Sequence, residues 1–521
     1  MSPDRADTPA SLWRSLPENL KALLRLGFTG KAHLLEVAVC SLLTGRADLV
    51  PVAGDALNLL VADHPLDGGL AAELLATEPA AALLGRETVA RLGILAAHWA
   101  RPSDMAASIN LLSWRDFART RTFLEQAVRD EPGNMFWREQ AVITGSVAND
   151  PDFVFACLKA PAPEAVRPVL TAARARALSR FSPSEAAPET LLAAARRSPW
   201  NAGLALRAFD ALAGVAEERC PLPGRTAVLL YSWNKADELD KTLTSLLAAD
   251  LSDVSVFVLD NGSTDRTAEV LSRHEPRFAD VLGADRFTRI HLPVNIGAAA
   301  ARNWLLHLDA VHEHDFCCYL DDDVELPTDW LARLGAAVRR YPEAGVWGCK
   351  VVDHANPLCI QSADNHLVMD PEAVVDLSRP DPNPFSLTGL HTQTLDAGCF
   401  DFMRPCASVT GCCHLFRTQT LIDTGDFAIQ LSPSQYDDME HDLRLCEAGR
   451  FPVYQGHLTV HHKKRTGATS MLSDQERGSA LGNKYKMQTM HARADIADAL
   501  KAEQELLEAD LLGKLEYLEG V

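Results

Sequence analysis

The stretch Phe316–Val324, with the sequence FCCYLDDDV, is a short apolar run that ends in three consecutive aspartates. An apolar run of about five residues between polar flanks is typical of a buried strand in a parallel sheet. Three adjacent carboxylates at the end of such a strand repel one another unless a cation lies between them. Open α/β sheets bind ligands at the carboxyl ends of their strands, and hard divalent cations prefer carboxylate oxygens. The stretch therefore predicts a metal site that receives a phosphorylated ligand, with a solvated acidic turn as the alternative.

The composition predicts a globular protein of two or three domains, because 521 residues exceed the size of one ordinary hydrophobic core. A net charge of −20 argues against a nucleic-acid or anionic-membrane surface, since either requires a basic face. No apolar run approaches the ~20 residues of a membrane-spanning helix, and Met1–Trp13 lacks the apolar core of a secretory signal. The 12 cysteines show no CxxC spacing, which favours buried thiols in a reducing compartment. We therefore expect a cytoplasmic protein.

Residues 1–216 carry almost no strand signal, and Ala and Leu recur there at helical spacing, which predicts an all-helical domain. Three Leu/Ala-rich stretches end at similar junctions, whose prolines Pro65, Pro132 and Pro199 are spaced 67 residues apart. This spacing is close to two units of ~34 residues, the length of a tetratricopeptide repeat. The junctions Ala127–Asn134 and Ala194–Asn201 also resemble the helix-to-helix junction of that repeat, which implies a degenerate solenoid that binds a protein or peptide. An irregular helical bundle is the alternative.

Residues 217–224 contain two prolines and a glycine and are predicted to link the helical domain to an α/β domain over 225–470. Thr226–Tyr231 and Val254–Leu259 are continuous apolar runs, and helical stretches follow both. Strands and helices that alternate in this way predict a parallel sheet with right-handed crossovers. Asp260 follows the second strand directly, so its carboxylate is expected at the sheet edge where a base or ribose can bind.

A further ligand-binding loop is predicted at Asn295–Asn303, where small residues open a helix. Small side chains let a helix N-terminus approach a ligand closely, and its amides and dipole favour phosphate. Arg302 is expected to add charge-assisted hydrogen bonds to that phosphate. A tightly packed, alanine-rich helix without a ligand is the alternative.

Taken together, residues ~225–465 resemble a family 2 glycosyltransferase of GT-A fold. The matching motifs, in the family's order, are TAVLLYSWNKADEL, DNGSTD, NIGAAAARN, LDDDVELPTDWL, GVWGCKVV, CIQSAD, VTGCCHLFRTQTLIDTGDF, YDDMEHDLRLCEAGR and VHHK. The resemblance implies an α/β GT-A catalytic domain, Rossmann-like with a mostly parallel sheet, beside the all-α N-terminal domain. It also implies metal-dependent, inverting transfer of a sugar from a nucleotide-diphosphate donor to an acceptor hydroxyl.

The resemblance implies roles for individual residues as well. Asp260 would contact the nucleotide base, Asp321 the ribose, and Asp323 the metal that bridges the diphosphate. Asp438 would be the catalytic base, and His461 or His462 a further ligand of the metal or diphosphate. Other residues expected to contact the nucleotide or its phosphates are Tyr231, Asn234, Asn261, Asn295, Gly297, Arg302 and Asp322. The implied cofactor is Mn²⁺ or Mg²⁺, with the nucleotide sugar as donor substrate.

Several of these assignments have alternatives in the sequence. Asp437 and Asp438 replace the family's more usual Glu-Asp, so either is a candidate base, and Asp322 is an alternative metal ligand. Additional candidate contacts are Trp233 and Lys235 for the base, Arg404 for the acceptor or diphosphate, and Lys463, Lys464 or Arg465 for the diphosphate. The long stretch His354–Asp401 is predicted to form part of an acceptor loop or lid. Residues 471–521 are predicted to form a C-terminal helical tail with an amphipathic stripe that docks on its own domain.

The leading hypothesis is a metal-dependent inverting glycosyltransferase whose helical domain recruits the acceptor, which we expect to be a protein. A glycosyltransferase of surface-polysaccharide assembly is the main enzymatic alternative. A non-catalytic GT-A-fold scaffold is another, but Asp321, Asp323 and Asp438 argue against it, because clustered acids cost stability. A nucleotidyltransferase with a similar sheet is a third alternative. It is expected to carry a glycine-rich loop after the first strand, and the sequence YSWNKADEL has no glycine, which argues against this class.

Overall fold

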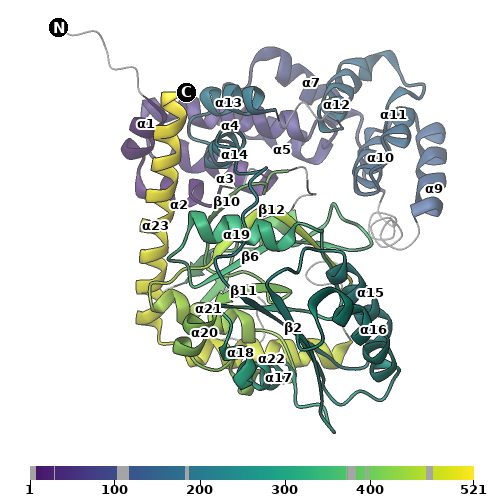
Figure 1. The fold of residues 1–521 in the computed structure, drawn as a ribbon. Coiled ribbons are helices and arrows are strands. Elements are labelled where there is room, and N and C mark those ends of the chain that lie inside the picture. Colours follow the sequence, from purple (N-terminus) through teal and green to yellow (C-terminus); the bar gives the residue numbers. More distant parts are fainter. Residues whose placement is uncertain are drawn as a thin grey trace. The chain divides into compact units, whose positions relative to one another are not determined.

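The computed structural model describes residues 8–27, 30–102, 117–181, 187–370, 372, 383–393, 396, 398–464 and 473–521. The chain divides into two compact units, coloured along the sequence in Figure 1. The helical unit comprises residues 1–211, 393–399 and 514–521, and the α/β unit comprises residues 212–392 and 400–513. Residues 373–382 of the predicted acceptor loop, and Arg465, lie outside the described residues.

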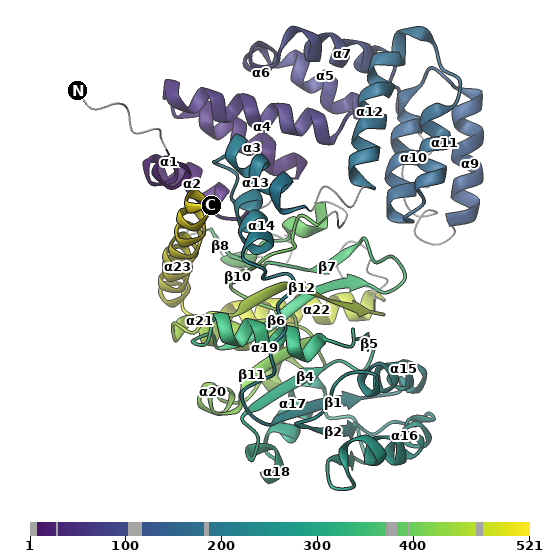
Figure 2. The same ribbon diagram turned by 45° about the horizontal axis from the view of Figure 1, so that its top comes forward.

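The described residues between 8 and 212 form helices and no strand, so the prediction of an all-helical N-terminal region is confirmed. In chain order its helices are α1 (Pro9–Ser15), α2 (Glu18–Leu24), α3 (Lys31–Leu43), α4 (Val50–Asp63), α5 (Gly68–Ala76), α6 (Glu78–Leu83), α7 (Arg86–Ala97), α9 (Phe117–Asp130), α10 (Met135–Val147), α11 (Pro151–Lys159), α12 (Arg167–Arg180), α13 (Pro188–Arg197) and α14 (Ala202–Leu212). Helices α9, α10 and α11 lie side by side in Figure 2.

The three junctions that repeat in the sequence share one local structure. Each proline lies between two helices, and the residue two positions later caps the second helix. The side chains of Asp67, Asn134 and Asn201 accept hydrogen bonds of 2.8, 3.2 and 3.1 Å from backbone N–H groups in the first turns of α5, α10 and α14. Such caps satisfy amides that have no partner inside the helix. The repeated Pro-x-Asx pattern is thus a helix-start signal, and its assignment to tetratricopeptide-like repeats stays a prediction.

The α/β unit is built on one mixed sheet. Its strands are β1 (Thr226–Ser232), β2 (Val254–Asp260), β3 (Phe287–His291), β4 (Phe316–Leu320), β5 (Val324–Glu325), β6 (Val346–Asp353), β7 (Ile360–Ser362), β10 (Met403–Pro405), β11 (Cys413–Arg417) and β12 (Val453–His462). The main order is β10-β12-β6-β11-β4-β1-β2-β3, with β5 beside β12 and β7 beside β6. The pairs β1–β2, β2–β3, β1–β4 and β6–β12 are parallel, and β11 is antiparallel to β4 and β6. The parallel run β4-β1-β2-β3, with helices between its strands, confirms the predicted α/β, Rossmann-like class of this domain.

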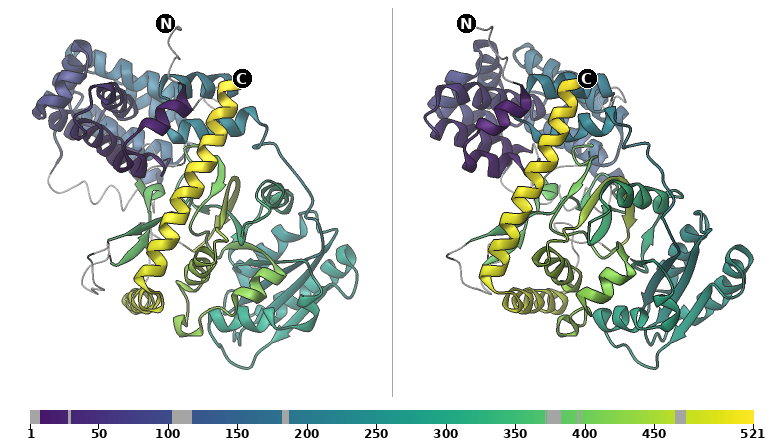
Figure 3. Two further views of the ribbon diagram at one scale, coloured as in Figure 1. Left: turned by 90° about the vertical axis from the view of Figure 1, so that its left-hand side faces the viewer. Right: turned by 60° about the vertical axis from the view of Figure 1, so that its left-hand side comes forward.

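Helices and a small hairpin complete the α/β unit. The hairpin pairs β8 (Leu367–Met369) with β9 (Phe385–Leu387). The helices are α15 (Ala236–Leu247), α16 (Thr267–Leu282), α17 (Ala298–Leu306), α18 (Asp309–His312), α19 (Trp330–Arg340), α20 (Thr418–Thr424), α21 (Asp437–Glu447), α22 (Asp474–Met490) and α23 (Arg493–Gly520). Figure 3 shows α23 as one long, straight helix. Its residues Ile496 and Leu500 pack in a core cluster with Leu443 and Cys446 of α21, as the amphipathic stripe predicts.

Strand register brings the predicted site residues to one edge of the sheet. All five residues of β4 are buried, and Leu320 at its end lies opposite Leu230 of β1. In the next pair, Asp260 at the end of β2 lies opposite Ser232. Parallel strands end at a common edge, so the aspartate triplet and the Asp260 loop emerge on the same side. Strand β12 returns to this edge, where His462 pairs with Val324 of β5.

Arg404 lies in the core instead of at this edge, contrary to the expectation that it contacts an acceptor or diphosphate. Its side chain is 2% exposed, and its guanidinium donates to both carboxylate oxygens of Asp364, at 2.9 and 2.5 Å. His366 lies between this pair and Glu503 of α23, whose carboxylate is 2.8 Å from the imidazole Nδ1. A guanidinium neutralised inside the core is not available to a ligand, so Arg404 has a structural role.

Candidate active site

The loops that follow β1 and β2 are joined by short hydrogen bonds. Asn234 Oδ1 accepts a hydrogen bond from the Thr264 N–H at 2.8 Å, and the Asn234 N–H donates to Ser263 Oγ at 3.0 Å. Asp260 is buried, and one of its carboxylate oxygens accepts from the Ser263 N–H at 2.9 Å. The other oxygen lies 2.9 Å from Nδ1 of the largely exposed His291. Asn234 and Asp260 therefore fix the shape of the loop that was predicted to hold the base.

A second asparagine pair connects this loop to the start of α17. Asn261 Oδ1 accepts from the Ile296 N–H at 3.0 Å, and Asn261 Nδ2 donates to Asn295 Oδ1 at 2.9 Å. Asn295 Oδ1 also accepts from the Gly297 N–H at 2.8 Å. A side chain at Gly262, where φ is +75°, would lie 2.5 Å from the backbone of the neighbouring loop. Asn261, Asn295 and Gly297 thus position the helix N-terminus, and the predicted sequence motifs do lie together.

The aspartate triplet is held by contacts from α15 and the loop before it. Lys235 Nζ lies 2.9 Å from Asp322 Oδ1 and 3.0 Å from Asp323 Oδ2. The Thr242 hydroxyl lies 2.9 and 2.8 Å from the carbonyl oxygens of Asp322 and Val324. Lys235 therefore offsets part of the repulsion among the three carboxylates, which is a different role from the base contact expected for it. Its neighbour Trp233 is 50% exposed, so its ring is accessible to a base.

His462, at the end of β12, contacts the aspartate triplet from the side opposite Lys235. Its Nε2 lies 3.0 Å from Asp323 Oδ1 and 3.9 Å from Asp321 Oδ2. Its Nδ1 lies 2.8 Å from Oε1 of Gln361. The Gln361 amide nitrogen donates to the carbonyl oxygens of His462 and Lys464, at 3.4 and 3.0 Å, which leaves Oε1 to accept from the imidazole. The ring is thereby held with Nε2 facing the acids, the arrangement typical of a metal-ligating histidine.

These residues fit a divalent cation. Asp321, His462 and Cys412 each offer one ligand atom, and the three atoms lie within 4.8 Å of one another. Asp323 is buried beside this group, and its Oδ1 lies 3.0 Å from His462 Nε2. A buried carboxylate is costly unless something positive lies beside it. His461 is not part of this group: neighbouring residues of a strand face opposite sides, and its ring packs edge-to-face against His354.

The acceptor-side acids lie on the first turn of α21. Asp437 is 3% exposed, and Arg302 Nη1 donates to its Oδ2 at 2.5 Å. The Arg302 guanidinium also lies 3.8 Å from Asp321, so it bridges the two acidic groups. Asp438 is only half-buried, and its Oδ2 accepts from the Gly411 N–H at 2.8 Å. Because Gly411 and Cys412 are adjacent in the chain, the base candidate and the cation group lie next to each other.

The electrostatic environment distinguishes these acids. Burial raises the pKa of Asp322 to about 6, although Lys235 opposes this shift. Burial acts in the same direction on Asp323, but His462 and Lys235 outweigh it and hold the Asp323 pKa below its usual range. Burial raises the pKa of Asp437 as well, against the effect of Arg302. Asp323 thus stays ionised more readily than Asp322 beside its cationic neighbours.

Three residues of this site were not predicted as functional from the sequence. Gln361, Gly411 and Cys412 lie within the quoted motifs, but their roles depend on strand register and side-chain direction. Of the basic residues after β12, Lys463 Nζ reaches the Glu238 carbonyl at 3.5 Å, and the Lys464 carbonyl helps to orient Gln361. Tyr231 lies under Arg302, whose guanidinium carbon is 5.6 Å from the ring centre.

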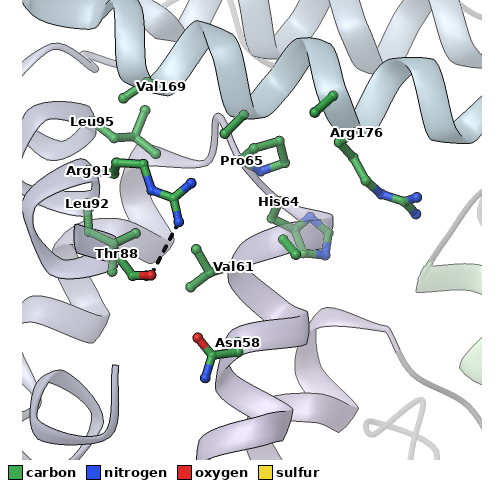
Figure 4. Close-up of a pocket in the computed structure, with 13 residues that line it drawn as sticks. Asn58, Val61, His64, Pro65, Thr88, Arg91, Leu92, Leu95, Val169 and Arg176 are labelled. Atoms are coloured by element: carbon green, nitrogen blue, oxygen red, sulfur yellow. Dashed lines mark hydrogen bonds between the residues drawn. The ribbon is translucent and has the colours of Figure 1, made fainter. Parts of the chain in front are cut away.

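The helical unit contains a separate pocket of about 300 Å³ (Figure 4). It lies between α4, α7 and α12 and is lined by Asn58, Val61, Ala62, His64, Pro65, Thr88, Arg91, Leu92, Leu95, Val169, Ala172, Ala175 and Arg176. In Figure 4 the dashed line marks the hydrogen bond from Arg91 to Thr88, whose length is 3.2 Å. The Arg91 Nε is buried and has no hydrogen-bond partner among the described residues. The pocket is therefore apolar, with cationic groups and without a carboxylate among its described lining residues.

Comparison with known proteins finds a family match over part of the α/β unit. Residues 227–396 match the model of glycosyl transferase family 2, so the resemblance found in the motifs is confirmed over that segment. No curated protein sequence is significantly similar to the chain. Every helix in the described ranges is too short or too polar to cross a bilayer.

Three solved structures give weak similarities. GalNAc-T7, solved with UDP, GalNAc and Mn²⁺, is 13% identical over 51% of this chain and 48% of its own, with a TM-score of 0.38. The mannosyltransferase PcManGT from Pyrobaculum calidifontis, solved with GDP-Man and Mn²⁺, is 16% identical over 64% of this chain and 86% of its own, with a TM-score of 0.37. TarS from S. aureus is 16% identical over 46% of this chain and 36% of its own, with a TM-score of 0.31. The chain thus matches about half the length of GalNAc-T7, and the function proposed below rests on the family match and the site geometry.

The close packing around Gly411 leads to a first prediction. A Cβ atom there would lie 2.5 Å from Arg302 Nη2 and 3.1 Å from Asp438 Oδ2. Gly411→Ala must therefore displace a buried guanidinium, and we expect it to lower the free energy of unfolding by about 1–3 kcal/mol, as overpacking usually does. Denaturant unfolding of the full chain measures this change. The control is Gly389→Ala, whose Cβ would meet only Thr392 Oγ1, at 3.9 Å. Equal stability of the two variants would contradict the placement of Arg302.

Proposed function

We propose that the α/β unit transfers a sugar from a nucleotide-diphosphate donor to an acceptor hydroxyl, with a divalent cation and with inversion at the anomeric carbon. The observation that carries this proposal is the juxtaposition of Asp438 with the group formed by Asp321 and His462, through Gly411 and Cys412. Displacement of a nucleoside diphosphate needs positive charge at the leaving group and a carboxylate at the incoming hydroxyl. The family match over residues 227–396 supports the same reaction class.

The donor half is assigned to the sheet edge. Asp321, Asp323 and His462 would hold a Mn²⁺ or Mg²⁺ ion, which supplies charge stabilisation for the leaving diphosphate when it is bound. The exposed Trp233 ring offers a stacking surface for the base. Asp260 ends the neighbouring strand β2, and its buried carboxylate would act by fixing the shape of the loop that receives the base. The first amide of α17, the Ala298 N–H, already donates to the Pro433 carbonyl at 2.9 Å, so the phosphates are assigned to the cation and not to this helix start.

The catalytic base is assigned to Asp438 rather than Asp437. Asp437 is buried and paired with Arg302, so its oxygen is already engaged by a guanidinium. Asp438 is half-buried and is fixed by backbone N–H groups, which leaves its carboxylate without a cationic partner of the kind that engages Asp437. Asp438 takes the proton of the acceptor hydroxyl. At the same time the hydroxyl oxygen attacks the anomeric carbon from the side opposite the diphosphate. A single displacement of this kind inverts the configuration.

The helical unit is proposed to bind the acceptor, which we infer to be a polypeptide. The pocket between α4, α7 and α12 is large enough for one side chain of a bound segment and presents an apolar surface. Arg91 has a buried nitrogen without a hydrogen bond to any residue that the structure describes, whereas Arg176 at the same pocket is paired with Asp63 at 3.2 Å. The Arg91 charge complements a carboxylate beside the apolar side chain. We therefore propose a segment in which an acidic residue adjoins an apolar one.

The base assignment predicts different outcomes for two matched variants. Asp438→Asn is expected to keep nucleotide-sugar binding but to lower the transfer rate by about 10²–10⁴-fold, because general base catalysis is worth that much. Asp437→Asn leaves Arg302 buried beside an uncharged group, so it is expected to lower thermal stability as well as rate. Release of nucleoside diphosphate from UDP- and GDP-sugars, together with calorimetric donor binding, measures both effects. Full turnover by Asp438→Asn would mean that another group is the base.

The acceptor assignment predicts an effect of filling the pocket. Val61→Trp places an indole in the pocket, and we expect it to weaken binding of acidic-apolar synthetic peptides at least about tenfold, since burial of one apolar side chain is worth ~1.5–3 kcal/mol. Donor-sugar hydrolysis by the α/β unit should be unchanged. The control is Leu178→Trp at a position that is 61% exposed on α12. Fluorescence anisotropy with labelled peptides measures binding. Equal affinity of both variants would contradict peptide binding in this pocket and favour the polysaccharide acceptor.

A further inference from the structure

The cation group contains a sulfur atom that the proposed reaction does not require. Cys412 Sγ, a carboxylate oxygen of Asp321 and a ring nitrogen of His462 lie within 4.8 Å of one another. We propose that Cys412 binds the divalent cation as a thiolate, together with Asp321 and His462. A site with this ligand prefers thiophilic ions such as Zn²⁺ and Co²⁺ to Mg²⁺. The inference rests on the proposed cation-dependent function and adds a ligand and an ion preference to it.

Strand pairing places Cys412 beside Asp321. In the antiparallel pair β4–β11, Leu320 lies opposite Cys413, and the next backbone contact is the Asp321 N–H donating to the Cys412 carbonyl at 3.2 Å. Residues directly opposite each other in an antiparallel pair have their side chains on the same face. The Asp321 carboxylate and the Cys412 thiol therefore face the same side. Cys413 faces the opposite side, because neighbouring residues of a strand alternate.

The two side chains beside the sulfur, His462 and Asp323, are arranged as in a metal site. The Gln361 side chain holds His462 with Nε2 directed at the acids, and this amide is itself oriented by two backbone carbonyls. Asp323 lies at the edge of the same group, with its Oδ1 3.0 Å from His462 Nε2. Asp323 is 2% exposed, so this oxygen is directed into the group and not into solvent.

The chemistry of the ligand set decides the ion preference. Mg²⁺ is bound almost entirely by oxygen atoms and retains several waters. Thiolate and imidazole ligands favour Zn²⁺ and its neighbours in the transition series. Binding requires the Cys412 thiol to lose its proton to solvent as the sulfur–metal bond forms, so one proton is released for each ion bound through sulfur.

Cobalt is a direct probe of this bond. The full chain, freed of metal by chelation and titrated with Co²⁺, is expected to show a near-ultraviolet thiolate-to-cobalt charge-transfer band. Cys412→Ser should lose the band and bind Zn²⁺ at least tenfold more weakly, while its Mg²⁺ affinity changes less than threefold. The control is Cys220→Ser, at a half-exposed cysteine outside the group, which should retain the band. Cys412→Ala serves as a second variant if the serine variant does not fold.

The outcomes separate this inference from the proposed function. Absence of the band in the wild-type protein, or its persistence in either Cys412 variant, would overturn the thiolate ligand. If nucleotide-sugar turnover depends on Mn²⁺ while the band is absent, the proposed function stands and this inference fails. If the band appears but no nucleotide sugar is turned over, the cation site stands and the transferase assignment fails.

Discussion

The repulsion among three carboxylates at the end of one buried strand is the constraint on which the α/β unit depends. Neutralising charge reaches them from three elements of the fold. Lys235, before α15, contacts Asp322 and Asp323. His462, at the end of β12, lies 3.0 Å from Asp323, and Arg302, on α17, lies 3.8 Å from Asp321. Because each partner comes from a different part of the sequence, the three adjacent acids are neutralised together only when the sheet is assembled.

Arg302 divides the acidic residues into two kinds. Its short contact with Asp437 makes that residue part of the framework, whereas the hydrogen bonds that hold Asp438 come from the backbone N–H groups of Gly411 and Met439. Two neighbouring carboxylates on one helix turn therefore acquire different chemistry from their surroundings. The same principle acts within the triplet, where burial raises the pKa of Asp322 while cationic neighbours lower that of Asp323.

The architecture could be predicted from sequence because it depends on local patterns. The apolar run before the triplet, the helical spacing in residues 1–216 and the order of the motifs each reflect burial on one face of an element. The strand period implies that only one of His461 and His462 faces the acids, but the choice depends on the pairing of β12 with β6 and β5. Gln361 and Cys412 could not be assigned for the same reason, since their contacts cross between strands. The expectation that Arg404 contacts the acceptor or diphosphate was wrong, because the sequence does not show that Asp364 neutralises this arginine inside the core.

The central claim is that the triplet and His462 form a cation-dependent site for a nucleoside diphosphate. The most direct measurement is thermal unfolding of the full chain with UDP, GDP, ADP and CDP, each with and without Mn²⁺. Ligand at about 100 times its dissociation constant stabilises the folded state by about 2.7 kcal/mol, which gives a clear rise in melting temperature. The account predicts a rise with one nucleotide that requires Mn²⁺ and is lost in Asp323→Asn. No rise with any nucleotide, or an equal rise in Asp323→Asn, would contradict it.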